Sequence, residues 1–192
     1  MNKPLYLFIG PSGSGKTTIA EMLENNYEYI QVRSYTTRKP RYDGEDNHIF
    51  VTKEEFEKLG ALAAYTYYNG EHYGTTFDQL TACDIYTIDI DGVKYLLEKM
   101  PDNNWPIRVL YFNSTVTTRI ERMVDRGSSD TEIISRLHND ERYEWYDKLN
   151  KIIWTNKYIH RKNVDMYIID ANAEKDAVLE QILYYMNLDK ED

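Results

Sequence analysis

Residues 10–17 read Gly-Pro-Ser-Gly-Ser-Gly-Lys-Thr and directly follow an apolar run at residues 5–9. A short apolar strand, a loop of the pattern G-x-x-x-x-G-K-[ST] and a helix together are typical of a phosphate-binding loop. The glycines let the backbone turn tightly and direct successive N–H groups at a phosphate chain. A glycine-rich turn that binds nothing is the alternative interpretation. The glycine spacing, the Lys-Thr pair and the strand context all disfavour it.

This phosphate loop, residues 10–17, implies a nucleoside triphosphate and a magnesium ion as ligands. Lys16 is placed to reach the β- and γ-phosphates, and the Thr17 hydroxyl is placed to bind Mg²⁺. The helix expected from residue 16 adds the positive end of its dipole. The residues expected to contact the triphosphate are Gly10, Ser12, Gly13, Ser14, Gly15, Lys16, Thr17 and Thr18.

The composition favours a single α/β domain in a reducing compartment. A chain of 192 residues has the length of about one domain. No apolar run approaches the ~20 residues of a membrane span, and the first residues do not open a signal peptide. The single Cys83 cannot form an internal disulfide, so we expect a cytoplasmic protein. With a net charge of −9, we expect neither a nucleic-acid nor a membrane partner.

Strands and helices alternate along the chain. Periodicity predicts strands at residues 5–10, 29–32, 85–90, 107–112 and 166–169, and short strands within 61–76 around the Asn69-Gly70 turn. It predicts helices at 16–24, 53–59, 76–82, 93–100, 115–126, 130–153 and 173–186, with a Thr52–Glu55 capping box. Strands separated by helices favour a parallel sheet covered on both faces, an α/β fold of the P-loop NTPase type.

Positive charge is concentrated in a polar, turn-rich segment of this acidic chain. Arg33, Arg38, Lys39 and Arg41 lie within nine residues of one another. Such a cluster in an acidic protein favours a small anionic ligand, and a solvated loop is the alternative.

The same segment resembles the guanylate kinase family. Residues 34–41 and then Gly44-Glu45 match the family's Ser-x-Thr-Thr-Arg-x-Pro-Arg-x-Gly-Glu motif, with Tyr42-Asp43 in place of one residue. The resemblance continues, in the family's order, at Tyr73-Gly74-Thr75, Ile88-Asp89-Ile90-Asp91, Arg126-Gly127 and Arg136-Leu137. It therefore spans nearly the whole chain.

The resemblance implies a nucleoside-monophosphate kinase that uses ATP and Mg²⁺ and phosphorylates GMP. It implies a single domain over residues 1–192 with a five-stranded parallel core at 1–32, 83–125 and 141–192. It also implies a monophosphate lobe at 33–82 and a mobile lid at 126–140. The expected partners are small nucleotides, and the expected state is a monomer or a homodimer.

In the family, paired arginines and a tyrosine hold the acceptor phosphate. Arg38, Arg41 and Tyr73 take those positions, and guanidinium forks suit phosphate oxygens. A tyrosine packed at a turn is the alternative for Tyr73. The resemblance assigns Ser34 and Thr75 to the guanine, and both are also common turn residues. The complete acceptor set is Ser34, Arg38, Arg41, His48, Tyr73, Thr75 and Asp91.

Metal and lid residues follow from the same resemblance. Asp89 ends an apolar strand, where a carboxylate near Mg²⁺ is expected, but capping of the next helix is an equal alternative. Arg126 and Arg136 match the family's lid arginines, which contact ATP and the transferring group, so the expected catalytic residues are Lys16, Arg38, Arg126 and Arg136. Arg119 and Arg142 instead suggest ion pairs with nearby acids on exposed helix faces.

Departures from the family keep two other functions open. Ala64 stands where the family has a guanine-reading glutamate, and Glu71 is the nearest downstream carboxylate. His48 replaces a phosphate-binding tyrosine, and Asp170 stands near the adenine site where the family has an asparagine, with Asn172 two residues on. A kinase of the same fold with another phosphorylated acceptor is one alternative. A non-catalytic binding module is the other, and the intact Lys16-Thr17 pair argues against it.

Overall fold

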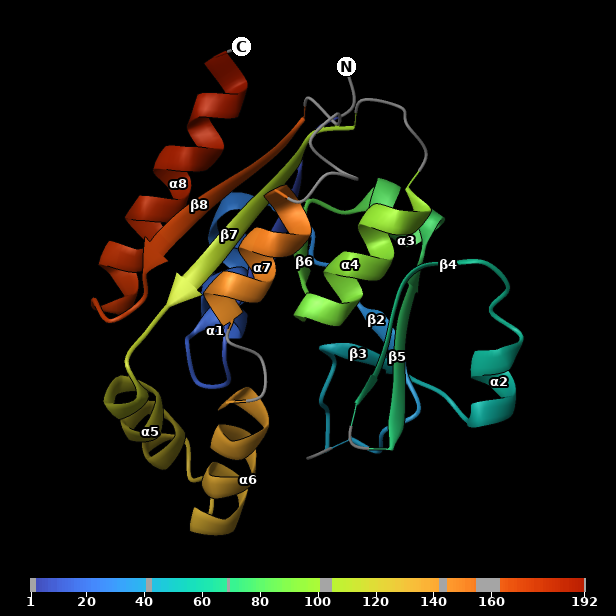
Figure 1. The fold of residues 1–192 in the computed structure, drawn as a ribbon, viewed down its shortest axis with the longest axis horizontal. Helices are drawn as coiled ribbons and strands as arrows, with labels where there is room; N and C mark the ends of the chain where they lie inside the picture. The colour runs from blue at the N-terminus through green and yellow to red at the C-terminus, as the bar shows by residue number, and fades with distance from the viewer. Residues whose placement is uncertain are drawn as a thin grey trace.

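The computed structural model describes residues 3–40, 43–68, 70–100, 105–141, 145–154 and 163–191. A four-stranded parallel sheet in the order β6-β1-β7-β8 forms the centre of the molecule (Figure 1). Its strands are β1 (Leu5–Ile9), β6 (Ile85–Thr87), β7 (Ile107–Asn113) and β8 (Val164–Asp170). All five residues of β1 are buried, as expected for a strand covered on both faces.

Helices cover the two faces of this sheet. On one face lie α4 (Ile90–Lys99) and α7 (Trp145–Trp154), which bury Leu96 and Leu149 against the strands. On the other face lie α1 (Lys16–Tyr27) and α8 (Lys175–Glu191), which bury Leu23 and Ile182. The predicted fold class, a parallel sheet flanked by helices, is confirmed.

A second sheet of four strands lies beside the first, in the order β3-β2-β5-β4 (Figure 1). It contains β2 (Ser34–Thr36), β3 (His48–Phe50), β4 (Leu62–Tyr68) and β5 (Glu71–Thr76). Two short helices, α2 (Lys53–Glu57) and α3 (Phe77–Ala82), flank it. The capping box expected at Thr52 and Glu55 is present. All of these elements fall within residues 33–82, the predicted monophosphate lobe.

Two predicted elements differ from the structure. The expected strand at residues 29–32, which would have made the parallel sheet five-stranded, is reduced to a single bridge between Gln31 and Ile85. The chain leaves this edge at once because Ser34 already pairs in the second sheet. In place of one helix over 130–153, the structure has α6 (Asp130–Glu141) and α7.

The physical reason for two helices is that each buries its apolar face in a different place. Ile153 of α7 packs into the core of the central sheet, whereas α6 contacts α5 (Val116–Asp125). Figure 1 shows α5 and α6 beyond the end of β7, apart from the sheet that α7 covers. Within the described residues, none of the helices is both long and apolar enough to cross a lipid bilayer.

Candidate functional site

The phosphate loop wraps the start of α1 at the carboxyl end of β1. Gly13 and Gly15 have φ angles of 78° and 94°, in the left-handed region that favours glycine. A Cβ on Gly13 would lie 2.8 Å from the backbone oxygen of Arg119, and one on Gly10 would lie 2.8 Å from that of Phe112. The close approach of β7 and α5 therefore requires glycine at both positions. This geometry fits the phosphate cradle predicted from the sequence.

Lys16 folds back over its own loop. Its ammonium donates to the carbonyl oxygens of Gly10 at 2.7 Å and Pro11 at 2.8 Å, and to the Ser14 hydroxyl at 3.2 Å. Burial lowers the pKa of Lys16 from its ordinary 10.5 to about 8, and the Asp140 carboxylate opposes that shift. The lysine is thus held at the loop as a cation that a phosphate oxygen can recruit. Thr17 and Thr18 are exposed beside it.

A cavity of about 460 Å³ opens next to the loop. Gly13, Ser14, Gly15 and Thr18 line one side, and Arg126 lines it from the end of α5. Four of the expected ATP residues and one expected lid arginine therefore share one cavity.

Arg122, a residue to which the sequence patterns assign no role, fixes the loop beside this cavity. Its guanidinium donates to the carbonyl oxygens of Ser14 at 3.3 Å, Ala171 at 2.7 Å and Ala173 at 3.0 Å. Arg122 thereby joins α5 to the phosphate loop and to the turn after β8. The spacing of Arg119, Arg122 and Arg126 by three and four residues, typical of one helix face, was the signal that could have identified it.

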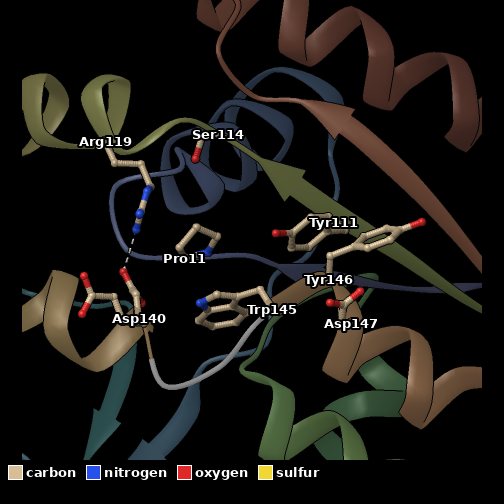
Figure 2. A pocket seen from close by; sticks show the side chains of 9 residues that line it. Pro11, Tyr111, Ser114, Arg119, Asp140, Trp145, Tyr146 and Asp147 are labelled. Carbon is tan, nitrogen blue, oxygen red and sulfur yellow. Dashed lines mark hydrogen bonds and ion pairs between the residues drawn. The ribbon is translucent and has the colours of Figure 1, made fainter.

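Helix α6, part of the predicted lid, contacts the phosphate loop through Asp140, which Figure 2 shows pointing towards Arg119. The Asp140 carboxylate accepts from the Ser12 backbone N–H at 2.9 Å and from the Ser12 hydroxyl at 3.4 Å. It also pairs with Arg119 at 2.9 Å, and both residues are only 7% exposed. Arg119 does pair with an acid, as the sequence suggested, but the pair is buried against the loop and not on an exposed helix face.

Arg136 lies in a second cavity, of about 380 Å³. Ser12 of the phosphate loop, Tyr68 at the end of β4 and Asn139 also line it. The structure therefore brings the second expected lid arginine next to the phosphate loop, facing the tip of the β4–β5 hairpin.

Arg38 is oriented by Glu45 within the predicted monophosphate lobe. Its two terminal nitrogens donate to Glu45 at 3.0 and 2.7 Å, and its guanidinium carbon lies 5.2 Å from the centre of the Phe50 ring. The Nε of Arg38 is buried and has no hydrogen-bond partner among the described residues. A donor left in this way is one that a phosphate oxygen can satisfy. The second expected arginine, Arg41, lies outside the described residues.

Four other expected acceptor residues, Ser34, His48, Tyr73 and Thr75, lie on strands of the second sheet. The Ser34 hydroxyl lies 2.9 Å from Nδ1 of His48, and the His48 ring lies edge-on to Tyr73 with centroids 5.7 Å apart. Thr75 is fully buried and donates to Gln79 at 2.8 Å. His48 therefore stands between two of the expected acceptor residues.

Asp89 caps α4, which is the alternative role that the sequence left open for this residue. Its Oδ1 accepts from the Gly92 backbone N–H at 2.7 Å and from the Thr66 hydroxyl at 2.8 Å. Burial raises the pKa of this carboxyl, while the Gly92 and Thr66 hydrogen bonds act against the rise. Asp91 sits in the first turn of α4 and pairs with Lys148 at 3.2 Å. This ion pair joins Asp91 to Lys148 of α7.

Thr17 and Asp89 carry oxygen atoms of the kind that Mg²⁺ binds. Mg²⁺ usually keeps several waters and takes one or two protein ligands together with substrate phosphates. Thr17 and Asp89 could supply such ligands. Among the residues that the structure describes, no three His, Cys, Asp or Glu side chains gather into a metal-binding group.

The position of the missing glutamate is a buried face of the lobe. Ala64 is fully buried and pairs in register with Thr75. Glu71 lies at the far end of β5, about 13 Å along the strand from Thr75. There Glu71 accepts a 2.6 Å hydrogen bond from Thr37. This separation disfavours Glu71 as the replacement for the absent carboxylate.

Asp170 and Asn172, the residues near the expected adenine site, hold the turn after β8. Asn172 accepts from the backbone N–H of Thr115 at 2.8 Å, and Asp170 accepts from the Asn172 backbone and side chain at 3.1 and 2.9 Å. Together they fasten the start of α5 to the end of β8. Arg142 lies outside the described residues.

The chain is similar to known proteins over most of its length. A family model described as guanylate kinase matches residues 2–135. A guanylate kinase from Neisseria meningitidis serogroup A is 31% identical over 153 residues, which cover 73% of this chain and 73% of that protein. A guanylate kinase from Lactococcus lactis subsp. lactis is 35% identical over 149 residues, which cover 69% of this chain and 70% of the relative.

A solved structure has the same fold. The crystal structure of guanylate kinase from Anaplasma phagocytophilum aligns with a TM-score of 0.55 at 18% sequence identity. The alignment covers 99% of this chain and 87% of that one. At this level of identity, the likeness concerns the fold alone.

Proposed function

Because the chain belongs to the guanylate kinase family, we propose that it transfers the γ-phosphoryl group of ATP to the phosphate of GMP. The chain is a nucleoside-monophosphate kinase by family, and the choice of GMP as acceptor is the finer part of the proposal. The observation that carries it is the complete phosphate loop, with Lys16 inside it and Arg126 and Arg136 lining the two adjacent cavities.

In this proposal the two half-sites use different residues. The loop N–H groups and Lys16 hold the ATP phosphates, and Arg38 and Arg41 hold the acceptor monophosphate with guanidinium forks. Ser34, His48, Tyr73 and Thr75 complete the acceptor side. The residues 33–82 then act as the monophosphate lobe, and 126–140 act as the lid.

The reaction needs no nucleophilic side chain and no general base. An oxygen of the acceptor phosphate attacks the γ-phosphorus in line, so the protein contributes positioning and charge stabilisation. Thr17 and Asp89 would hold Mg²⁺, which neutralises charge on the phosphate oxygens when it is bound. Arg126 and Arg136 neutralise charge on the transferring group, where an arginine can contribute a factor of about 10³–10⁵.

Lid closure serves a second purpose. Water competes with the acceptor phosphate as a nucleophile and would hydrolyse ATP. A lid that closes only when both nucleotides are bound excludes water from the loop. We place this reaction in the cytoplasm, and we expect a monomer or a homodimer whose site lies within one chain.

Ala64 favours a second candidate, a kinase of the same fold with another phosphorylated acceptor. A buried alanine offers no acceptor to the N1–H and amino group of guanine. A screen of all common nucleoside monophosphates with Mg²⁺-ATP, with direct identification of the product, tests both candidates. Turnover of GMP above the other monophosphates supports the first, and turnover of a different acceptor alone supports the second.

A further inference from the structure

Asp140 occupies a position that the local sequence does not explain. It lies in the last turn of α6, where the negative end of the helix dipole disfavours a carboxylate. It is nevertheless buried, 7% exposed, beside the equally buried Arg119. A buried charge requires compensating partners, so the contacts of Asp140 indicate why the position is tolerated.

Those contacts join three separate parts of the chain. The carboxylate accepts from the Ser12 N–H at 2.9 Å, 128 residues away in sequence, and from the Arg119 guanidinium at 2.9 Å. The backbone oxygen of Arg119 lies against Gly13, close enough that a Cβ there would be 2.8 Å away. The end of α6, α5 and the phosphate loop are therefore fastened at one point.

Asp140 lines a different cavity from those that Arg126 and Arg136 line. Asp140 and Arg119 line a separate cavity of about 310 Å³ together with Pro11, Tyr111 and Trp145 (Figure 2). Asp140 lines neither of the cavities that hold Arg126 and Arg136. Asp140 therefore holds the Ser12 backbone without lining either of these two cavities.

Arg136 lies one helical turn before Asp140. Side chains four residues apart lie on the same face of a helix, so the point where Asp140 is fastened fixes the height and rotation of Arg136. Arg136 and Ser12 line the same cavity. One oxygen of Asp140 thus ties the position of Arg136 to the Ser12 amide of the phosphate loop.

We propose that Asp140 is a positioning residue: with Arg119 it fastens α6 to the Ser12 amide and sets Arg136 over the phosphate loop for phosphoryl transfer. This inference rests on the proposed role of Arg136 in the transfer. A displacement of about 1 Å in a catalytic group can cost on the order of a hundredfold in rate. Loss of the fastening should therefore lower kcat far more than it weakens nucleotide binding.

Two kinds of variant remove the Arg119–Asp140 ion pair. Asp140→Asn removes one partner, and a paired variant replaces both. Removing one partner of a buried ion pair strands the other charge and can unfold the protein, whereas replacing both by apolar residues often preserves stability. Arg119→Met combined with Asp140→Leu is therefore the variant that separates positioning from stability. Glu141→Gln removes the same charge from the neighbouring, exposed residue and is the matched control.

We expect the paired variant to keep a melting temperature near that of the wild type and to lose roughly tenfold to a hundredfold in kcat. The acceptor KM and the Kd of a non-hydrolysable ATP analogue should change less than about threefold, since the charged contacts Lys16 and Arg38 of the two half-sites are unchanged. Glu141→Gln should behave as wild type. A stable paired variant with wild-type kcat would overturn the proposal.

A cycle with Arg136→Ala tests whether Asp140 acts through Arg136. If it does, adding the paired substitution to Arg136→Ala should lower kcat by less than about twofold more, because interacting residues are not additive. Multiplicative losses would overturn the proposal, and so would an Arg136→Ala variant with wild-type kcat.

Hydrogen exchange of the Ser12 amide provides a readout that needs no substrate. Exchange should accelerate in the paired variant and stay unchanged in Glu141→Gln, and equal protection in all three proteins would overturn the fastening. Failure of the wild type to phosphorylate any monophosphate would refute the proposed function, and the exchange result would still decide whether Asp140 holds the loop.

Discussion

The ammonium of Lys16 lies 2.7 Å from the carbonyl oxygen of Gly10, six residues earlier in the same loop. The loop thus holds the lysine ammonium against backbone carbonyl oxygens. A triphosphate would displace these oxygens because its own oxygens are negatively charged. This arrangement keeps the lysine at the site where phosphate oxygens are expected. It also makes Lys16 the first residue to test.

Lys16→Ala should abolish phosphoryl transfer to every acceptor and leave the protein folded. Loss of a preorganised charge at the transferring group costs on the order of 10²–10³ in rate. Product formation and thermal unfolding should be measured together, with Lys94→Ala on the exposed face of α4 as the control. Near-wild-type turnover by a folded Lys16→Ala protein would reject the kinase assignment.

The pH profile should carry the signature of the lowered pKa of Lys16, about 8 against an ordinary 10.5. The ratio kcat/KM for ATP reports the free enzyme, so it should fall as the pH rises through 8 and the ammonium loses its proton. Bound phosphate stabilises the charged amine, and the fall in kcat should therefore come at higher pH. Lys16→Arg keeps its charge and should lack the fall in kcat/KM.

Stability should change in the opposite direction over the same range. Between pH 8 and 10.5 the unfolded chain keeps the Lys16 proton that the folded protein has lost. The unfolded state then binds more protons, so the Lys16 contribution to the free energy of unfolding increases with pH. Urea unfolding at each pH, compared between wild type and Lys16→Met, checks the sign. The free energy of unfolding of the wild type, relative to that of Lys16→Met, should rise over this pH range. A fall in that relative free energy would contradict the expected sign.

Arg41→Ala should separate the two half-sites. Removing a guanidinium fork that holds only the acceptor phosphate should raise the acceptor KM about tenfold or more, since charged hydrogen bonds contribute about 1.5–3 kcal/mol. The Kd of an ATP analogue should change less than about twofold. Lys39→Ala removes the same charge from an exposed position in the same segment and serves as the control. Equal losses in both half-sites would place Arg41 elsewhere.

Ala64 predicts weak discrimination between GMP and IMP, which lacks only the exocyclic amine. A glutamate that reads this amine contributes about 1–3 kcal/mol per hydrogen bond, and Ala64 cannot. The kcat/KM ratio for the two substrates should therefore be small in the wild type and larger in Ala64→Glu. Ala64→Gln offers only one acceptor and should gain less.

Two outcomes would contradict the Ala64 argument. The first is a strong native preference for GMP that Glu71→Ala erases, which would mean that Glu71 reads the base in spite of its distance along β5. The second is turnover of a non-purine acceptor alone, which would leave only the broader kinase class.

Gly13→Ala should destabilise the protein and weaken ATP binding. The left-handed φ of 78° costs an alanine roughly 1–2 kcal/mol, and its Cβ would press on the Arg119 backbone oxygen. Gly60→Ala meets the same strain at φ 75° with nothing within 4 Å, so it isolates the backbone cost. Thermal unfolding and ATP-analogue binding of the two variants give the comparison. Equal losses in both would show that the contact with Arg119 is unimportant.

The phosphate loop could be predicted because its backbone conformation is local. Residues 10–17 define the loop by themselves. Their glycines permit the required backbone angles, and Lys16 is adjacent in the sequence. The capping box at Thr52 and the two short strands expected within residues 61–76 are local in the same sense. Such features depend on neighbours a few residues away.

Tertiary structure alone decided which charged side chains meet. Arg119 was expected on an exposed helix face, yet it is buried against Asp140, because packing of α5 on the loop removes water from both. Arg122 binds carbonyl oxygens from the loop and from the turn after β8. The spacing of the arginines marks a helix face, but it does not identify these distant partners. The sequence by itself determined the phosphate chemistry, since that depends on local backbone conformation. The arrangement of lid and loop depends on contacts more than a hundred residues apart, such as Asp140 with Ser12, and these form only when the whole chain packs.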